Sequence, residues 1–324
     1  MNPFDETGLS PPLAIVIPAY KAAFLAQALE SIASQTSKDF RVYIGDDASP
    51  HDLARICNQF SSRLDVRYVR FERNLGQSDL VAHWARCVAL SSEPWVWLFS
   101  DDDILEPDCV AAVLDRIQQD RGAFDLYHFD VLVIDSDGAV VRAAQPFADL
   151  TPALEFALAR AREQLESFAP DYVFSRQALE EAGGFERFPL AWCSDDATWI
   201  KVGRRGGIRA VRGPKVRWRR SGLNITSQQP GLAARKLVAA SQYVGWLSDY
   251  LLRCPPTPGE IGANLLMQSA LEWLRMHSRY LKTSFWPRVG LLGGWHLRKA
   301  FRYGLVGAWY QTAYWDLRLK LRGW

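Results

Sequence analysis

The first half of the chain alternates short apolar runs with segments whose apolar residues recur every three to four positions. The runs are typical of buried strands, and the three-to-four spacing is typical of helices. We predict strands at residues 13–17, 40–44, 66–71 and 95–99. We predict helices at residues 24–32, 52–60 and 76–89, and one more beginning at Pro107. This order predicts an α/β fold, a mostly parallel sheet flanked by helices.

The second half is less regular. Strand patterns occupy residues 124–135 and 216–220, and helical patterns occupy residues 154–168, 176–182 and 195–203. From about Pro230 onward the pattern is helical, with breaks expected at Pro255, Pro256, Pro258, Pro287 and Gly293–Gly294. We therefore predict two domains, an α/β domain at residues 1–229 and a helical C-terminal region at residues 230–324.

Three polar clusters follow predicted strands of the first half. They are Pro18-Ala19-Tyr20, Asp46-Asp47 and Ser100–Asp103. In open parallel sheets, ligands bind beyond the carboxyl ends of the strands. The spacing therefore predicts a ligand site at one edge of the sheet.

The run Asp101-Asp102-Asp103 is the strongest chemical signal in the chain. Adjacent carboxylates repel one another unless a cation or hydrogen-bond donors neutralise them. A divalent cation prefers oxygen ligands, and it would also offset the charge of a departing nucleotide diphosphate. The alternative is a solvated acidic turn that caps the next helix. At the end of a buried parallel strand we favour the cation.

Two other acidic pairs carry weaker signals. Asp46-Asp47 would place a carboxylate near a nucleobase or ribose, or would form an ordinary turn with a helix cap. Asp195-Asp196 begins a predicted helix, where one carboxylate would act as a general base or merely cap the helix. The residues alone leave both choices open.

No segment matches the glycine-rich GxGxxG or GxxxxGK[ST] phosphate loops. This argues against a nicotinamide-dependent enzyme and against a P-loop NTPase. A nucleotidyltransferase would also use carboxylate-bound metal, but it normally needs a glycine-rich basic loop that residues 18–21 do not provide. A metal ion would then have to hold the phosphates.

Composition narrows the possible partners and compartment. The net charge of +2 argues against a general nucleic-acid binder. Five scattered cysteines without a CxxC pair argue against a disulfide framework or a zinc site, and indicate a reducing compartment. A polar N-terminus and the absence of a long apolar run predict neither signal peptide nor spanning helix. We expect a cytoplasmic protein.

The C-terminal region has a charge of its own. Residues 271–324 carry +8, whereas residues 1–270 carry −6. Six tryptophans are interleaved with the basic residues, at positions 273, 286, 295, 309, 315 and 324. Such helices often lie on a membrane surface, here the inner face of the cell membrane. A packed cap or an oligomer interface explains the pattern equally well.

Taken in order, eight segments resemble those of family-2 glycosyltransferases with the GT-A fold, across residues 13–227. The segments are Ile15–Tyr20, Ser31–Thr36, Gly45–Ser49, Arg73–Gly76, Ser100–Asp108, Phe174–Phe185, Ser194–Lys201 and Trp218–Thr226. The resemblance implies inverting transfer of a sugar from a nucleotide-diphosphate sugar to the hydroxyl of a glycan or lipid-linked acceptor, in polysaccharide or other surface-glycan assembly.

The resemblance also implies roles for single residues. Asp102 would ligate Mn²⁺ or Mg²⁺ with help from Asp103. Asp196, with Asp195 beside it, would remove the proton from the acceptor hydroxyl. The nucleotide sugar would contact residues of four loops. These residues are Pro18, Ala19, Tyr20, Asp47, Asn74, Gly76, Asp101 and Asp102.

Two positions depart from the family pattern. Ser100 replaces the first acid of the usual Asp-x-Asp, and Ser221 replaces a histidine near residue 220. Arg219 or Arg220 would then hold the diphosphate, or would lie on a solvated strand edge. These departures also allow an alternative hypothesis. In it, the protein has the same fold but is a catalytically inactive binder of nucleotide sugars or carbohydrates.

Overall fold

The computed structural model describes residues 12–222, 224, 232–289, 317 and 321, and in the last helix it describes side chains up to residue 277. The chain forms two compact units. The first unit comprises Met1–Ala153, Leu165–Phe185 and Thr198–Ser221; the second comprises Leu154–Gln164, Glu186–Ala197 and Gly222–Trp324. The domain boundary expected near Gln229 lies outside the described residues and stays a prediction.

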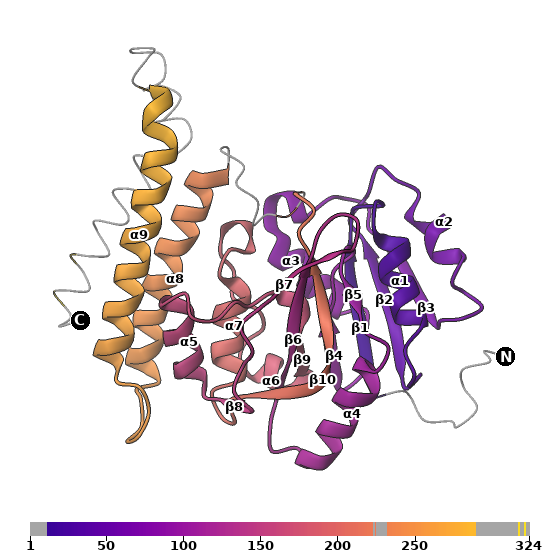
Figure 1. Ribbon diagram of the computed structural model, residues 1–324, viewed down its shortest axis with the longest axis horizontal. Coiled ribbons are helices and arrows are strands. Elements are labelled where there is room, and N and C mark those ends of the chain that lie inside the picture. The colour runs from indigo at the N-terminus through magenta and orange to yellow at the C-terminus, as the bar shows by residue number, and fades with distance from the viewer. Residues whose placement is uncertain (1–11, 223, 225–231, 290–316, 318–320, 322–324) are drawn as a thin grey trace. The chain divides into compact units, whose positions relative to one another are not determined.

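The first unit contains a ten-stranded sheet (Figure 1). Its strands are β1 Leu13–Ala19, β2 Phe40–Asp46, β3 Val66–Arg70, β4 Trp95–Leu98, β5 Ile104–Leu105, β6 Leu126–Ile134, β7 Val140–Ala143, β8 Leu150–Thr151, β9 Tyr172–Ser175 and β10 Ile208–Arg219. Its helices are α1 Leu25–Ala33, α2 Leu53–Asn58, α3 Gly76–Val88, α4 Cys109–Asp120 and α6 Arg176–Glu181, with a short 3₁₀ turn η1 at Ala169–Asp171.

The sheet has the order β3-β2-β1-β4-β9-β6-β10-β5, with β7 beside β6 and β8 beside β10. Strands β3, β2, β1 and β4 are parallel to one another, and β6 and β10 are parallel to each other. Strand β9 lies antiparallel between β4 and β6. Because β1 and β2 pair in register from Leu13 to Ala19, the loops after both strands emerge at the same edge.

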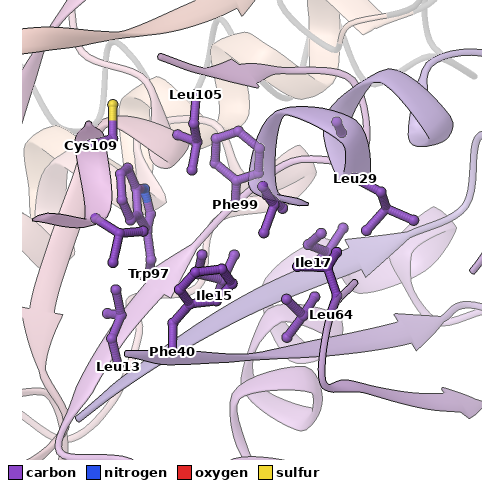
Figure 2. Close-up of a cluster of buried hydrophobic side chains, with 14 of the residues drawn as sticks. Leu13, Ile15, Ile17, Leu29, Phe40, Leu64, Trp97, Phe99, Leu105 and Cys109 are labelled. Atoms are coloured by element: carbon purple, nitrogen blue, oxygen red, sulfur yellow. The ribbon is translucent and has the colours of Figure 1, made fainter. Parts of the chain in front are cut away.

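The sheet is buried on both faces, as an α/β fold requires. Leu13, Ile15 and Ile17 point to the face covered by α1 and α4, where they pack with Trp97 and Phe99 (Figure 2). Ala14 and Val16 alternate to the opposite face and are also fully buried. Helix α3 covers that face, and its Cys87 approaches the β2 backbone at Gly45. The sequence prediction of a mostly parallel sheet flanked by helices is confirmed.

The predicted elements of the first half agree with the observed ones to within two residues at most ends. The antiparallel strands β5, β7, β8 and β9 were not predicted. Each is only two to four residues long, so its hydrophobic pattern is too brief to distinguish it from a loop. Strand β10 also begins eight residues before the predicted strand at 216–220, across a bulge between Val211 and Val216.

The second unit is helical in its described part. It holds α5 Ala153–Ala161, a 3₁₀ turn η2 at Pro189–Ala191, α8 Ala233–Arg253 and α9 Ala263–Val289, and the division between the units falls inside α7 Ser194–Val202. Helix α8 ends just before Pro255, as predicted. Helix α9 runs through Pro287 to Val289, so the break predicted there is wrong.

Aromatic side chains join α8 to α9 within the second unit. The Tyr243 and Trp246 rings stack with centroids 6.0 Å apart, and Trp273 meets Tyr243 edge-on at 6.1 Å. Trp273 thus packs against a neighbouring helix of its own unit. The other five C-terminal tryptophans lie outside the part whose side chains are described, and so does the expected break at Gly293–Gly294. No helix in the described ranges is long and apolar enough to cross a membrane.

Candidate functional site

The acidic turn Asp101–Asp103 directly follows β4, between the strand and the two-residue β5. All three residues are buried, with at most 4% of their surface exposed. They do not cap α4, whose first turn has no side-chain cap. A solvated, helix-capping turn is therefore not what the structure shows. Three carboxylates instead meet at the carboxyl edge of the sheet, and each has a different set of partners.

Asp101 joins the turn to the loop after β1. One of its oxygens, Oδ2, accepts hydrogen bonds from the backbone N–H groups of Tyr20 and Lys21, at 2.9 and 2.8 Å. The Tyr20 carbonyl in turn accepts from the Ser49 hydroxyl at 2.7 Å, which ties in the loop after β2. The predicted residues Pro18, Ala19, Tyr20 and Asp101 are thus brought together, with the Tyr20 side chain 44% exposed beside them.

Among the described residues, the Lys21 ammonium is the cationic side chain in close contact with Asp102. The Lys21 Nζ bonds Asp102 Oδ2 and lies 3.3 Å from Asp101 Oδ1. Burial by itself lowers the pKa of Lys21, but the two carboxylates outweigh it, and the pKa is raised above its usual range. Burial also raises the pKa of Asp102, while Lys21 acts in the opposite direction.

Asp103 is held by the last strand of the sheet. Its Oδ1 accepts from the Arg219 backbone N–H at 2.7 Å. No hydrogen bond of regular geometry from the described residues reaches its buried Oδ2. Burial raises the pKa of Asp103 well above its usual value, and the neighbouring Asp102 carboxylate adds to this effect. Hydrogen bonds from the Arg219 N–H and the Ser100 hydroxyl act in the opposite direction.

The Arg219 guanidinium is fully buried and extensively hydrogen-bonded. It donates to the carbonyls of Asp102, Asp135 and Ser136 and to the side chain of Gln27, at 2.8 to 3.1 Å. It therefore fastens the acidic turn to the sheet. The prediction that it holds a diphosphate is untested, and the exposed Arg220 next to it is the more accessible of the two.

The acidic turn suits a divalent cation that is shared with a substrate. Mg²⁺ and Mn²⁺ sites of phosphate-transferring enzymes commonly use one or two carboxylates and fill the remaining positions with phosphate oxygens and water. Asp102 and the buried Oδ2 of Asp103 supply such oxygens. Within the described residues, no three His, Cys, Asp or Glu side chains gather as a complete metal site. The metal role of Asp102 and Asp103 stays a prediction.

Asp47 organises a second part of the same edge. Its oxygens accept from the N–H groups of Leu75 and Gly76, at 2.7 and 2.8 Å, and from the Arg86 guanidinium. The Asn74 amide donates to the Asp47 carbonyl at 3.1 Å. The structure thus brings the predicted Asp47, Asn74 and Gly76 together. Asp47 caps α3, which is not the next helix in the chain, and its proposed contact with a base is untested.

Asp46, beside Asp47, has its own buried network. Its Oδ2 accepts from the Tyr68 hydroxyl at 2.5 Å and from Arg70 at 2.8 Å, while Oδ1 accepts from the Ser49 N–H at 2.7 Å. Arg70 is half exposed at this edge. Sequence reasoning missed Arg70, Arg86 and Lys21. Only Lys21 had a signal, since it continues the quoted Pro18-Ala19-Tyr20 loop.

Asp195 and Asp196 belong to the second unit, in the first turn of α7. The Arg160 guanidinium of α5 contacts both oxygens of Asp196, with Nε and Nη2 at 3.1 Å. Asp195 is less buried than Asp196. Desolvation raises the pKa of Asp195 to about 7, the Asp196 charge adds to the effect, and Arg160 opposes it. The predicted base therefore sits in a fixed ion pair that the sequence did not reveal.

The fold is that of GT-A glycosyltransferases. The solved structure of Staphylococcus aureus TarS residues 1–349 superposes with a TM-score of 0.63, at 13% identity over 93% of this chain and 80% of that one. Its complex with UDP-GlcNAc gives 0.59, at 15% identity over 84% and 74%. A Pyrobaculum calidifontis mannosyltransferase in complex with GDP-mannose and Mn²⁺ gives 0.53, at 14% identity over 95% and 88%.

Sequence comparison finds similarity to one family over part of the chain. Residues 14–163 match the model described as Glycosyl transferase family 2. An uncharacterized glycosyltransferase of Haemophilus influenzae is 32% identical over 117 residues, or 36% of this chain. The chain matches about two fifths of that relative's length, 38%. The part of the chain that contains β1 to β4 and the acidic turn is therefore similar to family-2 glycosyltransferases.

Proposed function

We propose that this protein transfers a sugar from a nucleotide-diphosphate sugar to an acceptor hydroxyl, with inversion at the anomeric carbon. The observation that carries the proposal is the buried Asp101–Asp103 turn, hydrogen-bonded to the loop after β1 in a family-2 domain. The complexes of structural relatives with UDP-GlcNAc and with GDP-mannose and Mn²⁺ support this donor class.

The proposed reaction is a single displacement. The acceptor oxygen forms a bond to the anomeric carbon while the bond from that carbon to the phosphate oxygen breaks. The electron pair leaves with the nucleoside diphosphate, and the proton of the acceptor hydroxyl passes to Asp196. Bound Mn²⁺ or Mg²⁺ would supply charge stabilisation for the diphosphate, and Asp102 and Asp103 would hold it.

Arg160 has a clear part in this proposal. A carboxylate that must accept a proton has to be ionised beforehand and aimed at its substrate. The two-nitrogen contact of Arg160 with Asp196 fixes the orientation of the plane of the carboxylate. Arg160 is thus a positioning residue, and Asp196 is the proposed catalytic one.

The acceptor is proposed on the family resemblance alone. We propose a hydroxyl of a glycan or of a lipid-linked sugar, in polysaccharide or other surface-glycan assembly. Contact of the C-terminal region with the inner face of the membrane belongs to the same proposal. Flotation with liposomes of anionic lipid, with and without the residues after Gln229, measures that contact, and equal flotation of the two proteins would count against it.

The donor is found by measuring thermal unfolding with UDP-, GDP- and dTDP-sugars, each with and without Mn²⁺. At a ligand concentration one hundred times the Kd, binding stabilises the protein by about 2.7 kcal/mol, which is readily measured. The sugar that protects is then incubated with the protein, and nucleoside diphosphate is quantified. An inactive nucleotide-sugar binder would be protected but would release none. The anomeric configuration of the product, read by NMR, tests inversion.

A further inference from the structure

Lys21 occupies the place where the proposed cation would have to act. Its ammonium contacts Asp102 and lies 3.3 Å from Asp101, with 29% of the side chain exposed. It is the cationic side chain that neutralises this pair in the described structure, because Arg219 turns its guanidinium to main-chain carbonyls and to Gln27. The acidic turn is therefore already provided with a counter-ion.

The carboxylates themselves have little freedom to move. Phe99 donates its N–H to Val16 at 2.8 Å before the turn, and β5 pairs with β10 after it. Arg219 binds the turn from a third side, through Asp103 Oδ1 and the Asp102 carbonyl. The mobile partner is the Lys21 side chain, a point charge on a flexible four-carbon stem that is partly open to solvent.

A divalent cation and the Lys21 ammonium cannot both neutralise Asp102 at close range. They compete for the same buried carboxylate, and two positive charges a few ångströms apart repel one another strongly in a poorly hydrated site. A cation arriving alone must therefore displace the ammonium into solvent. A cation arriving with a nucleoside diphosphate brings phosphate oxygens, which accept the displaced ammonium.

We propose that Lys21 is a resident counter-ion that makes metal binding at Asp102 conditional on a nucleoside diphosphate. This inference rests on the proposed function, since it assumes the same donor class. Lys21 is then a positioning residue whose ammonium leaves Asp102 and binds the diphosphate when the donor arrives. The metal is excluded while the donor site is empty and is admitted together with the donor.

The test is the affinity for Mn²⁺ alone, measured from the electron paramagnetic resonance signal of the free ion. Lys21→Met should bind Mn²⁺ at least about tenfold more tightly than the unaltered protein, because the competitor is gone. Lys215→Met is the matched control. The Lys215 ammonium donates to the Gly213 carbonyl at 3.3 Å rather than to a carboxylate of the acidic turn.

The same titration repeated with UDP at saturation measures coupling. In the unaltered protein UDP should tighten Mn²⁺ binding strongly, whereas in Lys21→Met the enhancement should shrink by about tenfold. If GDP is the nucleotide that protects in the donor screen, GDP replaces UDP here. Equal or weaker Mn²⁺ binding by Lys21→Met without nucleotide would overturn the proposal.

Lys21→Gln covers the case in which Lys21→Met does not fold, because it retains a donor while losing the charge. If either variant folds only when Mn²⁺ is present, the metal has replaced the ammonium, and the proposal is supported. If Mn²⁺ neither binds more tightly nor stabilises the variants, the proposal fails. The metal-only measurement needs no turnover, so its failure is distinct from a failure to cleave nucleotide sugars.

Discussion

The two acidic clusters of this protein meet the same electrostatic problem in different ways. In the first unit, Asp101 and Asp102 are neutralised by the amine of Lys21, which is partly exposed. In the second unit, Asp196 is neutralised by the guanidinium of Arg160, which contacts both of its oxygens. An ammonium can leave one carboxylate for another ligand with little geometric cost, whereas a planar fork holds one carboxylate in one orientation.

The difference matches the roles proposed for the two clusters. A carboxylate that ligates a metal must release its resting partner when the metal arrives. A carboxylate that accepts a proton must stay ionised and correctly oriented through every cycle. Lysine in the first cluster therefore suits a carboxylate that exchanges its partner, and arginine in the second suits a carboxylate that keeps one orientation. Both assignments can be tested.

The largest effect is expected at the fixed cluster. Asp196→Asn should lower kcat by about 10³-fold, because the amide cannot accept the proton of the acceptor hydroxyl. The donor Kd, measured by calorimetry, should stay within about twofold because the amide keeps the shape of the site. Asp115→Asn, at an exposed position of α4, is the control. Full activity of Asp196→Asn would remove this residue from the role of base.

The exchangeable cluster should give the next effect. Asp102→Ala should weaken donor binding in Mn²⁺ by about a hundredfold and abolish the difference between titrations with and without Mn²⁺. The loss follows from removal of the carboxylate that is best placed to hold the cation. Donor binding that keeps its full dependence on Mn²⁺ in this variant would exclude Asp102 as a ligand.

Arg160→Lys converts the fixed pair into an exchangeable one. The charge remains, but the two-nitrogen contact with Asp196 is lost, and kcat should fall by about tenfold. Steady-state kinetics at one fixed pH measure this loss, and the melting temperature of the variant is recorded beside them. A purely structural arginine would change the melting temperature and leave kcat of the folded variant unchanged.

The smallest effect concerns Asp195 and stability. Burial holds its pKa at about 7, above the ordinary 3.8, so the folded protein binds this proton more tightly than the unfolded chain does. Stability from this group is therefore complete below about pH 4 and is lost as the pH rises through 7. The neighbouring charges are Asp196 and Arg160, and the Cys193 thiol and the Tyr243 hydroxyl titrate only at higher pH because burial raises their pKa values.

Asp195→Asn removes this titration. Its melting temperature should change less between pH 5 and pH 8 than that of the unaltered protein, and it should exceed the unaltered value by a few degrees at pH 8. Differential scanning calorimetry at matched ionic strength measures both. A variant whose melting temperature follows the same pH curve as the parent would show that Asp195 titrates normally.

The sequence predicted the parallel half of the sheet well. Strands such as Leu13–Ala19 are apolar on both faces, and helices such as Gly76–Val88 carry a clear three-to-four repeat. Strand β9 was missed because Tyr172–Ser175 is only four residues long and its place depends on pairing with β4 and β6, which are about 80 and 45 residues earlier in the chain. Local pattern carries no information on such a partner.

The site shows the same limit. The acidic turn could be located from the sequence because three carboxylates follow a buried strand. Its neutralising partner could not, because Lys21 lies 81 residues earlier and Arg160 lies 36 residues before Asp196. Which cation faces which carboxylate is fixed by the pairing of strands and the packing of helices, and no residue spacing encodes it.

Gly45 and Gly76 limit how far this protein can diverge in sequence. A methyl group at Gly45 would lie 2.3 Å from the Cys87 sulfur, and one at Gly76 would lie 2.7 Å from an Asp47 oxygen. Neither glycine has a positive φ, so the constraint is space alone. In a library that samples every amino acid at each position, alanine at 45 should therefore require a smaller residue at 87 and a small shift of the Phe71 ring, which lies 3.0 Å from the added carbon. Alanine at 76 has no comparable compensation, because the nearest atom belongs to the Asp47 carboxylate.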